Sequence, residues 1–270
     1  MSGGMSGRPI LSLRNLSKTF RNGGGPLEVL SGVDLDVAEG ELVCLLGKSG
    51  CGKSTLLRLV AGFLSPDSGS VEVGGGRIAG PGPDRCVVFQ EDALFPWLTV
   101  RENVAFGVMR TMPRKVRDAE VRRCLEKVGL EPFGGSLPRE ISGGMKQRVV
   151  IAMALACEPD LLIADEPTSA LDVTVQKKIL DHLRYLTDSL GTSVLFITHD
   201  LGLAAERAQH IVVMYRGQVV ESGPSLEVLQ HPQPPSTKRL VHAAPSLASQ
   251  RIRSDKAAGL DASVDEEHHA

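Results

Sequence analysis

The sequence predicts an α/β fold built on a mainly parallel sheet, and three observations support this class. Short, continuously apolar segments occur, as expected of strands buried inside a parallel sheet. Longer segments with apolar residues at helical spacing separate them, and strands that alternate with helices favour parallel pairing. The 270 residues, of which 42% are hydrophobic and 23% charged, are enough to form a large buried core.

The spacing of apolar residues gives the expected elements in chain order. Half-buried strands, in which apolar and polar residues alternate, are expected at 10–16 and 29–37. Fully buried strands are expected at 42–46, 86–89, 161–164, 193–197 and 211–215. Helices are expected at 56–64, 101–133 and 141–157. Residues 74–83 are rich in glycine and proline and therefore predict turns.

The composition argues against several classes of function. A net charge of −2 and an aromatic content of 4% argue against a nucleic-acid partner. The five cysteines form no C-x-x-C pair, which disfavours a disulfide framework or a zinc site and predicts reduced thiols. The N-terminus lacks the apolar core of a signal peptide, and no run of about 18 apolar residues occurs. We expect a soluble protein, or one that reaches a membrane through a partner.

A glycine-rich loop follows the predicted strand at 42–46 and precedes a predicted helix. Its residues 47–54 fit the pattern G-x-x-x-x-G-K-[ST] at every fixed position. In such a loop the backbone N–H groups bind phosphates, Lys53 reaches the β and γ phosphates, and the Ser54 hydroxyl is a Mg²⁺ ligand. At a free position of the loop, Cys51 is interpreted as a small filler rather than a redox sensor. The predicted phosphate-binding residues are Gly47, Lys48, Ser49, Gly50, Cys51, Gly52, Lys53, Ser54 and Thr55.

Two carboxylates follow the apolar strand predicted at 161–164. Acids at the end of a buried strand are costly unless they bind something, although an acidic turn by itself is common. In enzymes with this kind of phosphate loop the first acid, here Asp165, holds Mg²⁺. The second, Glu166, is then placed to orient or deprotonate an attacking water. The pair therefore favours a hydrolase over a kinase.

The helix predicted at 141–157 begins with a second candidate phosphate-binding segment. Ser142 is a good N-cap residue, and Gly143 and Gly144 expose backbone N–H groups. Taken alone, this segment would be interpreted as an ordinary capped helix. Because one chain binds one γ-phosphate at Lys53, a second such site suggests a nucleotide held by a partner chain.

Together these motifs resemble the nucleotide-binding subunit of an ATP-binding cassette (ABC) transporter. The phosphate loop, Gln90, the segment ISGGM at 141–145, the acidic pair, the segment SALD at 169–172 and His199 occur in the order of that family. The resemblance covers about residues 10–225. It implies a RecA-like P-loop NTPase core with an antiparallel β subdomain and an inserted α-helical subdomain.

The resemblance also implies a domain division. The ABC ATPase domain would span 9–225, with the helical subdomain inserted at about 91–149. Residues 1–8 would be disordered, and residues 226–270 would form a partly disordered C-terminal extension.

Further residue roles rest on the resemblance. It implies that Phe20 stacks on adenine, although a core phenylalanine is the alternative, and that Asp172 helps to couple two ATP sites. Gln90 and His199 would join Glu166 as catalytic residues. Ser142, Gly143 and Gly144 would contact the γ-phosphate of ATP on the opposite subunit. The implied Mg²⁺ ligands are Ser54, Gln90 and Asp165.

One departure from the family pattern lies in the ISGGM segment. Met145 replaces the usual glutamine, so any contact of that amide with the partner's nucleotide is in question, whereas Ser142, Gly143 and Gly144 remain.

The implied function is ATP hydrolysis that energises import of a small solute. The implied partners are transmembrane permease subunits, a second ABC subunit in a homodimer or heterodimer, and an extracytoplasmic solute-binding protein that acts through the permease. The chain would then lie at the cytoplasmic face of the inner membrane. An exporter subunit and a soluble ABC ATPase outside transport are the alternatives.

Two subgroups of importers are similar to different parts of the chain. Residues 71–90 and 94–107 resemble the nitrate, sulfonate and taurine group, whereas 141–176 and 231–247 resemble the oligopeptide, dipeptide and nickel group. The longer second match slightly favours the peptide and nickel type. Trp97 is expected either to anchor the permease or to pack under the helical subdomain.

Overall fold

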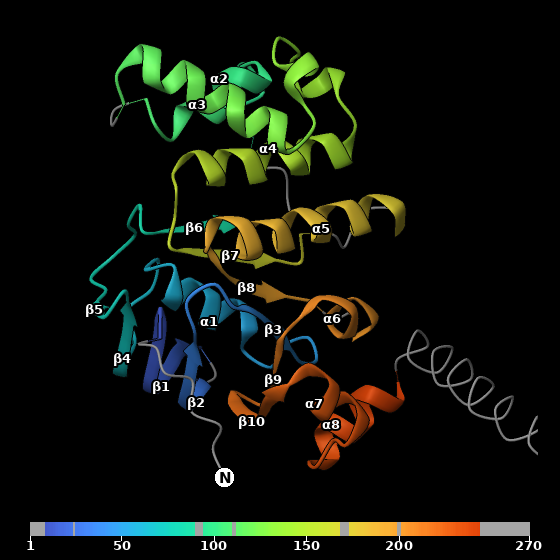
Figure 1. Ribbon diagram of the computed structural model, residues 1–270. Helices are drawn as coiled ribbons and strands as arrows, with labels where there is room; N and C mark the ends of the chain where they lie inside the picture. Colours follow the sequence, from blue (N-terminus) through green and yellow to red (C-terminus); the bar gives the residue numbers. More distant parts are fainter. Residues whose placement is uncertain are drawn as a thin grey trace, which may run out of the picture.

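The computed structural model describes residues 9–23, 25–89, 94–109, 112–167, 173–198 and 201–243. Gln90, Asp172 and His199 lie outside these ranges, as do residues 1–8. The described chain forms two sheets and three groups of helices, which confirms the predicted α/β class (Figure 1). Within these ranges, none of the helices combines the length and apolarity that a membrane span requires.

The larger sheet has six strands in the order β10-β9-β3-β8-β7-β6. All neighbouring pairs are parallel except β10 with β9. Its strands are β3 (Leu42–Leu46), β6 (Arg85–Val88), β7 (Leu161–Asp165), β8 (Ser193–Ile197), β9 (His210–Tyr215) and β10 (Gln218–Pro224). The five strands predicted from short apolar runs are therefore confirmed within one residue at each end.

Alternate residues of the central strands pack into two separate hydrophobic clusters. In β3, Val43 and Leu45 pack with α1 (Lys53–Val60) and the smaller sheet, whereas Cys44 points into the cluster of the opposite face. The second cluster joins the sheet to α4 (Gly143–Ala156) and α5 (Val173–Leu190). Burial on both faces explains why these strands are continuously apolar rather than alternating.

The smaller sheet is antiparallel, with the order β2-β1-β4-β5. Its strands are β1 (Leu11–Asn22), β2 (Gly25–Val37), β4 (Ser68–Val73) and β5 (Gly76–Arg77). The first two are longer than the predicted 10–16 and 29–37, because their hairpin pairing continues through several register shifts. Such bulges interrupt the alternation of apolar and polar residues on which the shorter prediction rested.

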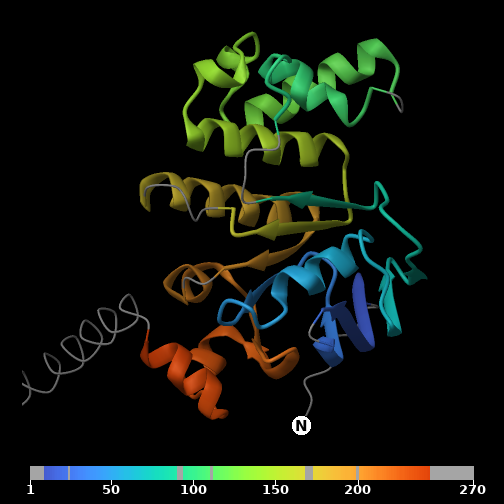
Figure 2. The same ribbon diagram turned by 180° about the vertical axis from the view of Figure 1, so that it is seen from behind.

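Three helices form a layer on the far side of the six-stranded sheet from the antiparallel sheet, as two opposite views show (Figure 1, Figure 2). They are α2 (Val100–Phe106), α3 (Arg114–Lys127) and α4. The prediction of helical structure over 101–133 is confirmed only in part: α2 ends at Phe106, with Gly107 as its C-cap, and Pro113 immediately precedes α3. Proline fixes φ and restricts the residue before it, so it starts a helix more readily than it continues one.

The C-terminal part of the described chain contains α6 (Leu201–Arg207), α7 (Ser225–Gln230) and α8 (Pro235–His242). Helices α7 and α8 lie within the segment for which only partial order was expected. Their buried residues Val228, Leu229 and Val241 belong to the same hydrophobic cluster as α4 and α5. The polar composition of this segment concealed these three buried apolar residues, two of which are adjacent.

We expect the two-sided burial of β3 to dominate the stability of the fold. Leu45→Ala should lower the free energy of unfolding by about 2–5 kcal/mol, because it leaves a cavity in a fully buried strand. The matched control is Leu226→Ala on α7, where the side chain is exposed and the change should be below about 0.5 kcal/mol. Chemical denaturation of both variants measures the difference, and equal losses would contradict this ranking.

Candidate nucleotide-binding site

The phosphate loop runs from the end of β3 to the start of α1 and requires glycine at two positions for steric reasons. A Cβ at Gly47 would lie 2.6 Å from both Cys51 Sγ and the Met214 carbonyl oxygen. Gly52 has φ of 109°, in the left-handed region that favours glycine, and caps α1. The loop backbone therefore lies closer to β9 and to its own turn than any other residue type would allow.

The side chain of Lys53 lies back over this loop. Its Nζ donates hydrogen bonds to the Gly47 carbonyl at 2.7 Å and to the Lys48 carbonyl at 3.3 Å. Only 9% of the residue is exposed. The first turn of α1 carries no acidic residue, so its N–H groups and the ammonium form one electropositive concavity.

The acidic pair stands at the carboxyl end of β7. Asp165 is the last residue of the strand, and Glu166 has a left-handed φ of 44°. The Glu166 N–H donates a 2.9 Å hydrogen bond to the Ile197 carbonyl at the end of β8. This bond holds the unusual backbone conformation, which turns the chain sharply after Asp165.

Burial and a like charge shift the pKa of Asp165. Desolvation raises the pKa of this carboxyl above its usual value, and the negative charge of Glu166 raises it further. The cations Lys53 and Arg58 act in the opposite direction. A second cation bound at this point would relieve the repulsion between the two carboxylates.

The loop and the acidic pair face the same cleft, which has a volume of about 550 Å³. Its lining residues are Val29, Ser49, Gly50, Gly52, Lys53, Ser54, Thr55, Asp165 and Glu166. All but Val29 were predicted from the sequence. Val29 comes from β2 of the antiparallel sheet, and an apolar residue in an alternating strand carries no signal that would have identified it.

Other predicted site residues lie elsewhere in the described structure. Ser142 is the N-cap of α4, where its hydroxyl accepts a 3.3 Å hydrogen bond from the Met145 N–H. It is exposed together with Gly143, whereas Gly144 is buried, and none of the three lines the cleft. Phe20 is half-buried on β1, with Lys18 Nζ at 5.8 Å from its ring centre, and also does not line the cleft.

A buried glutamine that the sequence analysis did not single out joins α4 to the larger sheet. Gln147 is only 3% exposed, and its Nε2 donates a 3.3 Å hydrogen bond to the Phe89 carbonyl. Phe89 directly precedes Gln90. Because Gln147 stands between Lys146 and Arg148, the sequence carried no signal that separated this buried polar residue from its charged neighbours.

Trp97 is exposed on the helical layer. It is 73% accessible, so the alternative in which it packs beneath the helices is wrong. Phe95 lies between it and Phe106, with ring centres at 5.7 Å and 4.3 Å respectively. The fully buried Asn103 holds the segment by bonding the Phe95 N–H at 2.8 Å and the Leu98 carbonyl at 3.0 Å. These three aromatic residues form a rigid apolar surface.

The sequence profile described as "ABC transporter" matches residues 30–169, more than half of the chain. The chain belongs to the ABC transporter family. This ABC chain therefore has the RecA-like P-loop core of that family, together with the antiparallel sheet and the helical layer described above.

Curated relatives of this ABC chain come from both importer subgroups. It is 44% identical over 205 residues to the nitrate import ATP-binding protein NrtD of Synechocystis sp., covering 76% of this chain and 77% of the relative. It is 40% identical over 261 residues to the dipeptide transport ATP-binding protein DppD of Bacillus subtilis, covering 88% and 77%. With the bicarbonate transport ATP-binding protein CmpC of Synechococcus elongatus it shares 41% identity over 237 residues, 86% of this chain but only 36% of the relative's length.

A solved structure supports the fold directly. The dimeric ATP-binding cassette MJ0796, described as a post-hydrolysis state bound to ADP and Pi, superimposes with a TM-score of 0.71 at 32% identity. The alignment covers 80% of the ABC chain and 98% of the solved chain.

Removal of the Lys53 ammonium should abolish nucleotide binding. We expect Lys53→Ala to weaken ATP binding at least about 100-fold, because a charge-assisted contact in a partly desolvated cleft is lost. Lys238→Ala, which removes an exposed lysine of α8, should bind as the wild type does. Isothermal titration with ATP compares the two variants, and tight binding by Lys53→Ala would refute the assignment of the loop.

The raised pKa of Asp165 predicts how stability varies with pH. The folded state holds the Asp165 proton to higher pH than the unfolded chain, so this group costs stability once pH rises above its unfolded value of about 4. Asp165→Asn should therefore be more stable than the wild type at pH 7. The gain should shrink as pH falls toward 4. Denaturant unfolding of the variant and the wild type between about pH 4 and pH 7 tests this pH dependence. A difference in the free energy of unfolding that stays constant over this range would contradict it.

Proposed function

We propose that this ABC chain is the ATP-binding and ATP-hydrolysing subunit of an importer of a small solute. The observation that carries the proposal is the position of Lys53 opposite Asp165 and Glu166 in one 550 Å³ cleft. A cation that neutralises phosphate charge and a carboxylate that accepts a proton from water are what hydrolysis of a phosphoanhydride needs. The post-hydrolysis state of MJ0796 supports the same reaction class.

Each predicted site residue has a separate role in the proposed reaction. Backbone N–H groups of the phosphate loop and Lys53 would bind and orient the β and γ phosphates. The carboxylate of Glu166 would take a proton from the attacking water, and its position is fixed by the bond between its backbone N–H and Ile197. Phe20 would stack on adenine, His199 would contact the γ-phosphate, and Gln90 would sense Mg²⁺ and the water.

The cleft also fits Mg²⁺. The Ser54 hydroxyl and the Asp165 carboxylate are oxygen ligands of the type this ion prefers, and the raised pKa of Asp165 marks a place where a cation is favoured. Ser54 and Asp165 would hold the ion, with Gln90 as a further ligand. When bound, Mg²⁺ supplies charge neutralisation at the phosphates.

A second ABC subunit is part of the proposal because Ser142 and Gly143 are exposed and lie away from the cleft of their own chain. Their N–H groups at the start of α4 would contact the γ-phosphate bound by the partner, and Asp172 would couple the two sites. The dimeric state of MJ0796 supports the pairing of two cassettes.

The proposed membrane partner is a pair of permease subunits, reached through the exposed Trp97 and Phe106 and the half-buried Phe95 between them. The chain would then act at the cytoplasmic face of the membrane, with a solute-binding protein on the other side. Relatives from the nitrate and the dipeptide groups match with 44% and 40% identity, so both anion import and peptide or nickel import are candidates.

Glu166→Gln tests the assignment of the general base. We expect ATP hydrolysis to fall at least about 100-fold while ATP binding is retained, because the amide cannot accept the proton of water. Gel filtration with Mg-ATP should then show a trapped dimer. Glu126→Gln, an exposed acid on α3, is the matched control and should hydrolyse ATP normally. Rapid turnover by Glu166→Gln would overturn the role of Glu166.

A further inference from the structure

One face of α3 carries basic side chains that the fold leaves exposed. The helix has six basic and three acidic residues, whereas the whole chain has a net charge of −2. Lys115 and Arg122 are seven residues apart and therefore lie on the same side of the helix. Both are exposed, and neither has an ion-pair partner among the described residues. Arg114 is exposed beside them, at 3.9 Å from Asp118. Arg114, Lys115 and Arg122 form the α3 patch.

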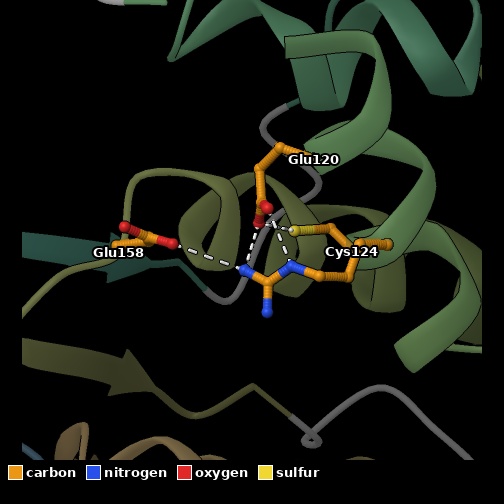
Figure 3. A network of polar contacts seen from close by, with 4 residues as sticks. Glu120, Cys124 and Glu158 are labelled. Atoms are coloured by element: carbon orange, nitrogen blue, oxygen red, sulfur yellow. Dashed lines mark hydrogen bonds and ion pairs between the residues drawn. The ribbon is translucent and has the colours of Figure 1, made fainter. Parts of the chain in front are cut away.

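The neighbouring Arg123 is not part of the α3 patch, because its guanidinium is used within the fold. It donates a 2.7 Å hydrogen bond to Glu120 and lies 3.4 Å from Glu158, which follows α4 (Figure 3). The Cys124 thiol donates a 3.2 Å hydrogen bond to the same Glu120. On the opposite side of the helix, Val121 and Cys124 belong to the hydrophobic cluster of α4 and α5. The helix is therefore fixed in place, and its exposed cations are held ready for a partner.

Apolar side chains flank the α3 patch. Val116 is 56% exposed on α3, and Met109 is 53% exposed just after α2. Arg117 donates a 3.4 Å hydrogen bond to the Met109 carbonyl, which holds this residue beside the first turn of α3. The proposed permease surface ends at Phe106, three residues before Met109. Basic and apolar side chains are thus exposed together, next to the surface that is proposed to meet a membrane protein.

The chemistry of this surface selects among the partners that could cover it. Ammonium and guanidinium groups bind phosphate, which both lipid headgroups and nucleic acids offer. Anionic lipids present their phosphates above an apolar layer, so they complement the cations and the exposed apolar side chains at once. A net charge of −2 and an aromatic content of 4% argue against a nucleic acid. The observations therefore favour a membrane surface.

We propose that the α3 patch binds anionic phospholipid headgroups, with Val116 and Met109 at the boundary of the acyl layer. The cations would lie against the lipid phosphates, while the buried side of α3 stays in the core of the protein. The proposal rests on the proposed function, because docking on a permease through Phe106 would bring the layer of α2 and α3 (Figure 1) to the membrane. The lipid contact would then hold the ATPase subunit at the membrane in addition to the permease.

The test uses the full chain and vesicles of defined composition. One set contains phosphatidylcholine alone, and the other contains equal parts of phosphatidylcholine and phosphatidylglycerol. Co-sedimentation should show binding of the wild type to the second set only, and salt should weaken this binding because it screens exposed charges. The double variant Lys115→Gln/Arg122→Gln should bind about 30-fold more weakly, since each basic residue near an anionic surface strengthens binding about fivefold.

The apolar part of the surface is tested separately. Val116→Ser should also weaken binding to the phosphatidylglycerol vesicles, because less apolar area would leave water. This loss should persist at high salt, where the effect of the charged residues is reduced. Unchanged binding by Val116→Ser would overturn the contact of this side chain with the acyl layer.

The double variant Lys238→Gln/Arg239→Gln is the matched control, because it removes the same two charges from the exposed side of α8. It should bind the vesicles as the wild type does. Circular dichroism checks that the variants fold, and all should hydrolyse ATP at the wild-type rate, so a failure of lipid binding is distinguishable from a failure of the ATPase assignment. Absence of binding by the wild type, or an equal loss in the two double variants, would overturn the proposal. The first of these results would favour an acidic protein segment as the partner.

Discussion

The nucleotide cleft depends on the burial of β3 and β7 on both faces. Each strand lies between two hydrophobic clusters, so its carboxyl end projects the following residues toward one edge of the sheet. Lys53 and the pair Asp165 and Glu166 meet there because β3 and β7, with β8 between them, run parallel and end at the same edge of the sheet. The arrangement concentrates two like charges in a partly desolvated place. Repulsion between the carboxylates of Asp165 and Glu166 lowers the stability of the folded chain. The same negative charge strengthens the binding of a cation, and with it the binding of phosphates.

Much of this site could be predicted from sequence because its parts are local. The phosphate loop requires glycine at Gly47 and Gly52 for reasons of space and of φ, and a lysine directly after them. These requirements fix the spacing of the two glycines and the lysine in the sequence, so the motif can be found there. Continuous apolar runs likewise revealed the buried strands, since a strand covered on both faces has no polar side. The acidic pair was visible because charge is unusual at the end of such a run.

Features that depend on distant contacts could not be predicted in this way. Val29 reaches the cleft through the packing of one sheet on another. The break before α3 was missed because the apolar residues that indicated a helix over 101–133 all follow Pro113, so the proline was not taken as a boundary. The longer hairpin was missed because bulges shift its periodicity. Residues Gln90, Asp172 and His199 lie outside the described ranges, so the structure does not place them.

The backbone N–H of Glu166 joins the end of β7 to the end of β8. A left-handed φ in a residue with a long side chain costs on the order of 1 kcal/mol, and the hydrogen bond to Ile197 offsets it. Ile197 ends β8, two residues before His199. A movement at the end of β8 would therefore be transmitted to the backbone that carries the Glu166 side chain.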